Sequence, residues 1–340
     1  MNSLAALLAR TSRTFALSIP RLPDPTRHAV TLAYLLFRIA DTFEDAAAWP
    51  RAQRSAALDT FLGILRDPHL AETGALPPGV AETARAWRDA RPSEHDGYLD
   101  LVAETPRVLD GLAALPASAR AAVLHHAART AEGMKGFVAQ STAQGGLRLG
   151  SLDDLRGYCY VVAGIVGELL TDLFVMDAPA LAPASPTLQR HARAFGEGLQ
   201  LVNILKDATD DARDGRTYLP PTVTREAVLD LARRDLDDAV TYVHALQSHD
   251  APRGFVEFTA LPVTLARATL DKLAAEGPGA KLPRDGDGPR RRARPAPRPG
   301  RPRPRDTVNR LTTARARWRG RAAPRRPCPR GAGAPCRRGR

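Results

Sequence analysis

The sequence predicts an all-α fold, and three observations lead to that prediction. Residues 1–282 consist of long Ala-, Leu- and Arg-rich segments in which apolar residues recur at three- and four-residue spacing, the period of an amphipathic helix. Pro and Gly interrupt these segments in stretches such as "ALPPGV" and "MDAPALAPASPT". No stretch shows a convincing alternation of polar and apolar residues, so no strand is expected. We therefore predict a single helical domain over residues 1–282.

The helices are expected in the following order. The first contains Tyr34–Trp49, a stretch that is apolar on almost every side, as a buried helix is. "LRDPHL" ends the second helix, "ALPPGV" precedes the third, and "MDAPALAPASPT" separates two long helices later in the chain. The expected ranges are 29–47, 54–66, 79–90, 95–112, 117–142, 152–176, 186–212, 224–247 and 252–275.

Composition limits the class of protein. With 340 residues, 44% of them apolar, the chain can bury a sizeable core. No run reaches the roughly 18 apolar residues of a membrane span, and the short N-terminal apolar stretch is interrupted by Arg10, so we expect a soluble, cytoplasmic protein. The three Cys have no CxxC spacing, which argues against a disulfide framework or a structural zinc site.

Two acidic stripes lie on helices that are otherwise apolar. Steps of three and four residues place the first stripe on one helix face: Tyr34, Arg38, Asp41 and Asp45. The same spacing gives the second, with Asp210 beside it: Gln200, Asn203, Asp207 and Asp211. One acidic pair is often only a solvated helix end, but two clusters inside apolar helices need cations to pair them. Carboxylates facing each other across a cavity suit Mg²⁺, which also binds substrate phosphates, so the pattern predicts a diphosphate substrate.

The motifs around these stripes carry a resemblance. "DTFED" (41–45) and "NILKDATDD" (203–211) look like the two aspartate-rich motifs of the squalene/phytoene synthase family, the head-to-head prenyl transferases. Further motifs follow in the family's order over residues 10–275: "SRTFALSI" (12–19), "AEGM" (131–134), "YCYVVAGIVGELLTDLF" (158–174) and "DGRTYLP" (214–220). Lys206 departs from the pattern, because an Arg commonly stands there, and the family's C-terminal region is not recognisable after about Lys281. The resemblance implies an isoprenoid synthase-type helical bundle with a central cavity.

An allylic diphosphate must leave as pyrophosphate, and metal ions and basic side chains have to meet the charge that develops on it. The expected Mg²⁺ ligands are Asp41, Asp45, Asp207 and Asp211, with Glu44 and Asp210 in support. The expected contacts of the diphosphate are Ser12, Arg13, Arg38, Lys206 and Arg216. Any one of these cations could be a surface residue, and Arg38 is the least expected to be one, because its helix is apolar all round. Arg38 is also expected to act in catalysis.

The carbocation left behind must be shielded from water, and aromatic faces stabilise a cation by about 0.5–2 kcal/mol each. The residues expected around the cavity are Tyr34, Phe37, Phe137, Tyr158, Gly164, Gln200 and Asn203. An aromatic residue in such a helix is more often plain core. The resemblance places Tyr158 where a proton is removed to close a cyclopropane intermediate. Gly164 and Gly167, one turn apart, either admit the substrate chain or form a packing seam between helices.

The leading interpretation is Mg²⁺-dependent, head-to-head joining of two C15 or C20 prenyl diphosphates. The "DTxED" form of the first motif favours farnesyl diphosphate and squalene, made through a cyclopropyl diphosphate, and phytoene or dehydrosqualene is the alternative within the family. NADPH is expected only if squalene is the product, and the chain carries no nucleotide-binding fingerprint. An all-α metal-dependent phosphohydrolase is the alternative of another class. The sequence does not give the oligomeric state.

The last part of the chain differs in composition from the rest. Residues 283–340 contain 20 Arg, no Lys and 3 Asp, a net charge of +17, which leaves −5 of the total of +12 for residues 1–282. This Arg- and Pro-rich tail is predicted to be disordered. One hypothesis is out-of-frame translation of a GC-rich gene after about Lys281, and the other is a basic arm for peripheral binding to an anionic membrane. No specific nucleic-acid partner is expected, because binding of a nucleic acid by the tail would not explain the buried carboxylates.

Overall fold

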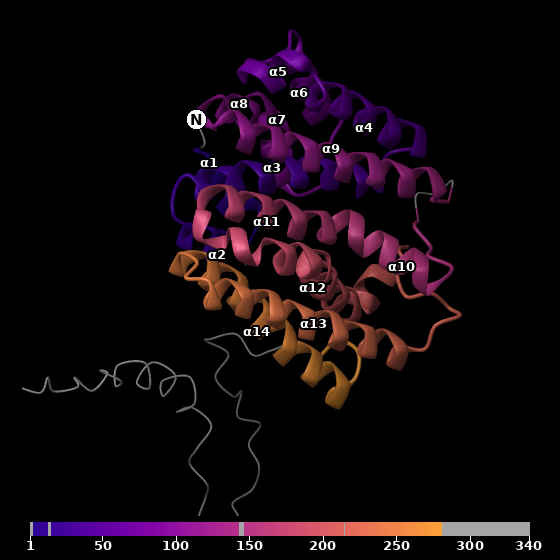
Figure 1. Cartoon of the computed structure of the whole chain (residues 1–340). Coiled ribbons are helices and arrows are strands. Elements are labelled where there is room, and N and C mark those ends of the chain that lie inside the picture. Colours follow the sequence, from indigo (N-terminus) through magenta and orange to yellow (C-terminus); the bar gives the residue numbers. More distant parts are fainter. Residues whose placement is uncertain (1–2, 13–14, 143–145, 214, 281–340) are drawn as a thin grey trace, which may run out of the picture. The chain divides into compact units, whose positions relative to one another are not determined.

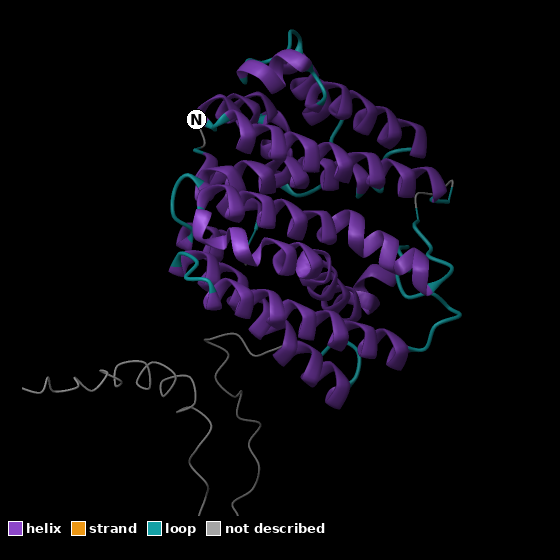
Figure 2. Cartoon of the chain, in the orientation of Figure 1, coloured by secondary structure: helices purple, strands orange, loops and turns teal. Residues whose placement is uncertain are grey.

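Residues 3–12, 15–142, 146–213 and 215–280 are described by this computed structural model, and within them the chain forms helices and no strand (Figures 1 and 2). The all-α prediction is therefore confirmed. The α-helices are α1 (Leu4–Thr11), α2 (Phe15–Ser18), α3 (Thr26–Glu44), α4 (Arg51–Leu65), α5 (Pro68–Thr73), α6 (Val80–Asp89), α7 (Asp96–Ala103), α8 (Thr105–Asp110), α9 (Ala117–Gln140), α10 (Leu152–Cys159), α11 (Ile165–Asp177), α12 (Ser185–Arg213), α13 (Arg225–Ser248) and α14 (Arg253–Glu276). The short turns are η1 (Ile19–Arg21), η2 (Gly111–Ala114), η3 (Tyr160–Gly164) and η4 (Pro179–Ala184). The predicted tail lies outside the described residues.

Long helices stacked side by side form the frame of the molecule (Figure 1). Helix α3 packs against α9, α9 against α4, α11 against α12, and α12 against both α13 and α14. Large side chains at these contacts are fully buried, among them Leu35, Phe43, Phe61, Phe174 and Phe255. Burying one side chain of this size contributes about 1.5–3 kcal/mol. The all-round apolar character of α3 therefore reflects neighbours on several sides.

The predicted helix boundaries agree with the structure to within three residues at each end, except in one segment. The range 95–112 is wrong as a single helix, because α7 ends at Ala103 and α8 begins at Thr105. Pro106 lies in the first turn of α8, where its missing N–H is tolerated, but it could not continue the hydrogen bonding of α7. Helices α1, α2 and α5 were not predicted, since none exceeds eight residues and each is too short to show a helical period.

The helix expected at 152–176 is present, but η3 interrupts it with a π-helical turn. The N–H of Ile165 donates to the carbonyl of Tyr160, five residues earlier instead of four. The stretch Leu152–Asp177 is long and apolar enough to span a membrane by length and composition, although half of its most apolar window is buried inside the bundle. Glu168 and Asp172 interrupt its apolar run, so the stretch contains no unbroken run of about 18 apolar residues.

Candidate active site

A cavity of about 530 Å³ lies between α3, α11, α12 and α14. Its lining is mostly apolar along the first part of α3 and of α12, and polar along the last part of both. The apolar lining includes Phe15, Ile19, Val30, Phe37, Leu170, Phe195, Leu199, Phe258 and Pro262. The polar lining comprises Arg38, Asp41, Glu44, Asp45, Gln200, Asn203, Lys206, Asp207, Asp211 and Arg216. The cavity thus has a charged region and an apolar region.

Arg38 lies on α3 where the apolar lining gives way to the charged lining. Its Nη1 donates to Oδ2 of Asp41 at 2.6 Å, and its guanidinium carbon lies 5.7 Å from the ring centroid of Tyr34 and 5.4 Å from that of Tyr98. Burial lowers the pKa of Arg38, but Asp41 and the two tyrosines outweigh it and raise the pKa above its ordinary value. The buried Nε of Arg38 has no hydrogen-bond partner. Arg38 is therefore a fixed cation with a donor left for a ligand.

The carboxylates of the first acidic motif influence one another's ionisation. Burial raises the pKa of Asp41 to about 6, although the Arg38 guanidinium opposes the shift. Burial, followed by the charges of Asp45 and Asp41, raises the pKa of Glu44 well above its ordinary value. Like charges at close quarters disfavour the ionised form, and a nearby cation favours it. The region is therefore electrostatically suited to receive additional positive charge.

The second acidic motif presents only part of its charge to the cavity. Nζ of Lys206 lies 3.2 Å from Oδ2 of Asp207 and donates to Oδ1 of Asn203 at 3.3 Å. Asp211, one helical turn after Asp207, also lines the cavity. Asp210 does not line it and pairs with Arg213 at 2.9 Å. The supporting role of Asp210 stays a prediction.

Arg216 connects the two acidic motifs. Its side chain forms an ion pair with Asp45, which follows α3, and its backbone N–H donates to the carbonyl of Asp211 at the end of α12 at 2.9 Å. Burial lowers the pKa of Arg216, but the charge of Asp45 leads a set of neighbours that raise it above its ordinary value. Arg216 is therefore protonated between two groups of carboxylates.

The position of Arg216 is set by a short pairing of two loops. The N–H of Thr217 donates to the carbonyl of Leu147 at 2.9 Å, and the N–H of Leu149 donates to the carbonyl of Thr217 at 3.2 Å. A Cβ on Gly146 would lie 2.5 Å from the carbonyl oxygen of Gly215, which itself has a φ of +77°. Glycine at both positions is therefore what allows the loops to meet.

Tyr158 and Tyr218 lie together in the wall of the cavity. The hydroxyl of Tyr158 donates to that of Tyr218 at 3.3 Å, and the ring centroids are 4.8 Å apart. Burial and then the charge of Glu44 raise the pKa of Tyr158 well above its ordinary value. Phe137 packs edge-on against Tyr158 at 5.2 Å and is not part of the lining, so its predicted place in the cavity is corrected.

Most of the predicted site residues meet at the cavity. Those in the lining are Tyr34, Phe37, Arg38, Asp41, Glu44, Asp45, Tyr158, Gln200, Asn203, Lys206, Asp207, Asp211 and Arg216. Gly164 is not in the lining, because it lies against the ring of Tyr160, and a Cβ there would be 2.7 Å from Cδ2 of that ring. Ser12 is also outside the lining, and its hydroxyl accepts from the N–H of Phe15 at 2.9 Å. Arg13 lies outside the described residues.

Sequence reasoning missed three kinds of lining residue. Tyr218 belongs to the quoted segment "DGRTYLP", so an aromatic residue two positions after Arg216 was the available signal. Phe258 and Pro262 come from α14, whose sequence shows only the pattern of a packed helix. Gly196 faces Ala163 so closely that a Cβ would lie 1.9 Å from the carbonyl oxygen of Ala163, and a single glycine in a helix gave no signal of this contact.

The donor set of the charged region fits Mg²⁺, which prefers carboxylate oxygens and usually shares its coordination with substrate phosphates. Asp41, Asp45 and Asp207 are each paired with a basic side chain. Among the described residues, no three His, Cys, Asp or Glu side chains converge closely enough to hold a metal ion.

Known proteins resemble this chain in sequence and in fold. The squalene synthase of Schizosaccharomyces pombe is 27% identical over 289 residues, which cover 78% of this chain and 57% of that protein. The bifunctional lycopene cyclase/phytoene synthase of Colletotrichum graminicola is 31% identical over 232 residues, which cover 66% of this chain and 35% of that protein. The chain thus spans between about a third and three fifths of the length of these two relatives.

The fold also matches a solved structure. TcSQS in complex with the ligand BPH1237 superposes with a TM-score of 0.58 at 23% identity, over 78% of this chain and 76% of that one. At this level of identity the likeness shows a shared helical fold. Residues 8–230 match the family model for squalene/phytoene synthase. The chain belongs to the squalene/phytoene synthase family.

Proposed function

We propose that this protein joins two prenyl diphosphates head to head in a Mg²⁺-dependent reaction. The observation that carries the proposal is a single cavity in which a charged region adjoins an apolar one. A diphosphate group suits the first region and a prenyl chain suits the second. An enzyme that only hydrolysed ordinary phosphomonoesters would have no use for the apolar region.

The charged region is proposed to bind and activate the diphosphate. The proposed Mg²⁺ ligands are Asp41, Glu44, Asp45, Asp207 and Asp211, all of which line the cavity. When bound, Mg²⁺ neutralises the charge that develops on the leaving pyrophosphate. Arg38, Lys206 and Arg216 are proposed to contact the diphosphate oxygens directly. The planar guanidinium groups of Arg38 and Arg216 are suited to phosphates, because they offer two parallel N–H donors.

The apolar region is proposed to protect the allylic carbocation from water until the second prenyl group attacks it. Tyr34 and Phe37 offer aromatic faces that stabilise positive charge. The hydroxyl of Tyr158 is proposed to take part in the proton removal that closes the cyclopropane. Its hydrogen bond to Tyr218 supports this role, because a partner at 3.3 Å restricts where the hydroxyl points.

Farnesyl diphosphate is the proposed substrate and squalene the proposed product, with a cyclopropyl diphosphate as intermediate. Phytoene or dehydrosqualene is the alternative, and the relatives include both squalene synthases and a bifunctional enzyme with phytoene synthase in its name. NADPH is required only if squalene is the product. Because a hydrocarbon product has to reach a lipid phase, we further propose a cytoplasmic enzyme that works at a membrane surface, and flotation with liposomes tests this.

Product analysis tests the proposed function. The purified protein is incubated with Mg²⁺ and labelled C15 or C20 prenyl diphosphate, with and without NADPH, and the lipids are extracted. The proposal predicts release of pyrophosphate and a C30 hydrocarbon from the C15 substrate. A C40 product would select the phytoene alternative. Release of inorganic phosphate from simple phosphomonoesters, with no coupled product from either substrate, would contradict the proposal.

A further inference from the structure

The π-helical turn η3 follows Tyr158 directly and determines which residues share a face with it. In an uninterrupted α-helix, the residues at i+4, i+7, i+8 and i+11 lie on the face of residue i. The one extra residue in η3 moves this set by one position, to Ala163, Val166, Gly167 and Leu170, and all four line the cavity with Tyr158. Of the set that α-helical counting selects, Val162, Val166 and Leu169 line it too, and only Ile165 is buried outside the lining. The turn therefore brings Tyr158 into register with the cavity wall of α11.

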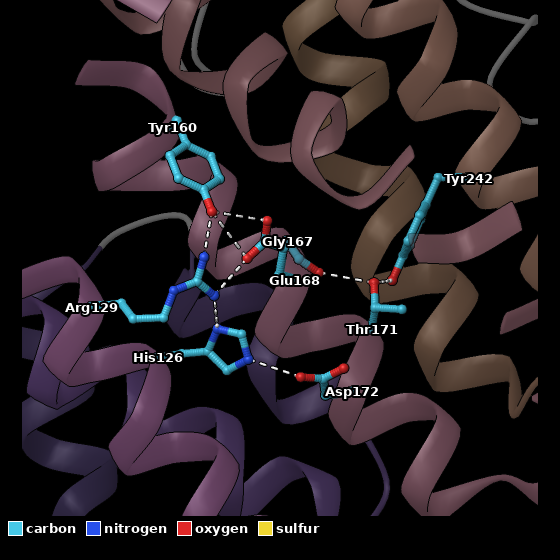
Figure 3. A network of polar contacts seen from close by, with 8 residues as sticks. All are labelled: His126, Arg129, Tyr160, Gly167, Glu168, Thr171, Asp172 and Tyr242. Carbon is cyan, nitrogen blue, oxygen red and sulfur yellow. Dashed lines mark hydrogen bonds and ion pairs between the residues drawn. The ribbon is translucent and has the colours of Figure 1, made fainter. Parts of the chain in front are cut away.

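A polar network of side chains outside the cavity lining contacts the start of the turn (Figure 3). Arg129 of α9 donates to the hydroxyl of Tyr160, and that hydroxyl donates to Oε1 of Glu168 on α11 at 3.2 Å. Arg129 also pairs with Glu168 at 2.7 Å. These three side chains form a closed triangle that joins α9, η3 and α11.

The network is held in place by its neighbours. Nη1 of Arg129 lies 3.2 Å from Nδ1 of His126, whose Nε2 lies 2.8 Å from Oδ2 of Asp172 (Figure 3). The guanidinium carbon of Arg193, on α12, lies 4.6 Å from the ring centroid of Tyr160. Gly164 gives the Tyr160 ring room to lie over the turn, which accounts for a glycine that does not face the cavity.

A second contact holds the middle of the turn. The buried hydroxyl of Thr130 on α9 donates to the carbonyl of Val161 at 3.2 Å. A hydroxyl that bonds a helix carbonyl competes with the regular ladder of backbone hydrogen bonds. Gly133 lets α9 approach at the same point, since a Cβ there would lie 2.5 Å from Cγ2 of Val161. Helix α9 therefore contacts both the start and the middle of η3.

We propose that Tyr160, Arg129, Glu168 and Thr130 form a clasp that maintains η3 and thereby positions Tyr158 against Tyr218. Tyr160 is a positioning residue here, because it acts through the turn and does not line the cavity. If the turn closed into a regular α-helix, Tyr158 would rotate by one residue, about 100°, relative to the wall formed by α11. The inference rests on the proposed role of Tyr158, and its physical part can be tested without turnover.

Fluorine NMR of the full chain, labelled with 3-fluorotyrosine at its six Tyr positions, reports on Tyr158 directly. The variant Tyr158→Phe identifies the resonance. Tyr160→Phe keeps the ring but removes the hydroxyl from the triangle, and Thr130→Val removes the bond to Val161. At least one of these two variants is expected to shift or broaden the Tyr158 resonance.

Tyr242→Phe is the matched control. This variant also removes a tyrosine hydroxyl that is hydrogen-bonded to α11, because the hydroxyl oxygens of Tyr242 and Thr171 lie 2.9 Å apart. That hydrogen bond involves no residue of η3 (Figure 3). The control is expected to leave the Tyr158 resonance in place. A Tyr158 resonance that is unchanged in both Tyr160→Phe and Thr130→Val, or that moves equally in the control, overturns the clasp.

Steady-state kinetics separate positioning from folding. Misplacement of a reacting group by about 1 Å can lower the rate about 100-fold. Tyr160→Phe is therefore expected to lower kcat at least about tenfold. Its KM and melting temperature should stay close to those of Tyr242→Phe. An unchanged kcat in Tyr160→Phe overturns the clasp even where prenyl coupling is confirmed. If the wild-type protein couples no prenyl diphosphate, the proposed function fails, and the NMR comparison still decides whether η3 is held as proposed.

Discussion

Replacing Gly167 by Ala is predicted to force two cavity helices apart. A Cβ at this position of α11 would lie 1.9 Å from the carbonyl oxygen of Ala192 on α12 and 2.9 Å from its carbonyl carbon. Real Cβ atoms essentially never approach another heavy atom closer than 3.0 Å, so the helices must separate locally by about 1.1 Å. The oxygen belongs to the backbone, and no side-chain rotation can relieve the contact.

The size of the effect follows from that displacement. Overpacking of this kind costs about 1–3 kcal/mol, which for a domain of this size lowers the melting temperature by about 2–10 °C. A shift of about 1 Å in a cavity wall can also reduce turnover by up to about 100-fold. The variant should therefore lose both stability and prenyl coupling while keeping its helical content.

Thermal melting by circular dichroism and the rate of coupled-product formation are the assays. Gly136→Ala on α9 is the matched control, because no atom lies within 4 Å of a Cβ there. It should melt at the wild-type temperature or above, since Ala favours a helix interior over Gly by about 1 kcal/mol. A Gly167→Ala variant that melts and turns over like the wild type would refute the close packing of α11 on α12.

The remaining predictions concern single side chains. Tyr218→Phe keeps the ring but removes the hydrogen-bond partner of the Tyr158 hydroxyl. The kcat should fall by about three- to tenfold at an unchanged melting temperature. An unaffected kcat would show that this hydrogen bond does not contribute to turnover. Lys206→Arg supplies a bidentate fork at the diphosphate, and a lower KM is expected in steady-state assays, whereas a raised KM would count against Lys206 as a phosphate ligand. Burial raises the pKa of Asp235 to about 6, so the folded state binds more protons than the unfolded state between about pH 4 and pH 6 and loses stability as the pH rises through that range. At pH 7.5, Asp235→Asn should therefore melt at a higher temperature than the wild type, because its free energy of unfolding is larger by about 1–2 kcal/mol. At pH 4 this gain should be absent. An equal gain at both pH values would exclude the Asp235 charge as its cause.

Much of the charged region could be predicted because its residues follow helical spacing within two continuous helices. Asp41 on α3 and Asp45 at its C-terminal end lie one turn apart, as Asp207 and Asp211 do on α12, and all four line the cavity. The ion pair between Asp45 and Arg216 could not be predicted from spacing, since a pairing of two loops produces it.

Local contacts that leave no trace in residue spacing place several other residues. Gly164 and Gly167 both lie against α12, where a Cβ on Gly167 would meet the carbonyl of Ala192, and of the two only Gly167 is in the cavity lining. The π-helical turn of η3, whose Val161 carbonyl accepts from Thr130 of α9, leaves no period in the sequence to find. Asp210, which was expected beside the second stripe, lies outside the cavity lining and pairs with Arg213.

The central claim is that carboxylates of both acidic motifs activate a prenyl diphosphate for coupling. The most direct measurement is the yield of C30 product from labelled farnesyl diphosphate with the wild-type protein and with Asp41→Asn, each with Mg²⁺ and with EDTA. The account predicts a C30 product and pyrophosphate only from the wild type with Mg²⁺, while Asp41→Asn keeps its helical spectrum and melts no lower than the wild type, because it loses a buried charge but no packed volume. Coupling by Asp41→Asn at the wild-type rate, or coupling by the wild type in EDTA, would contradict the account.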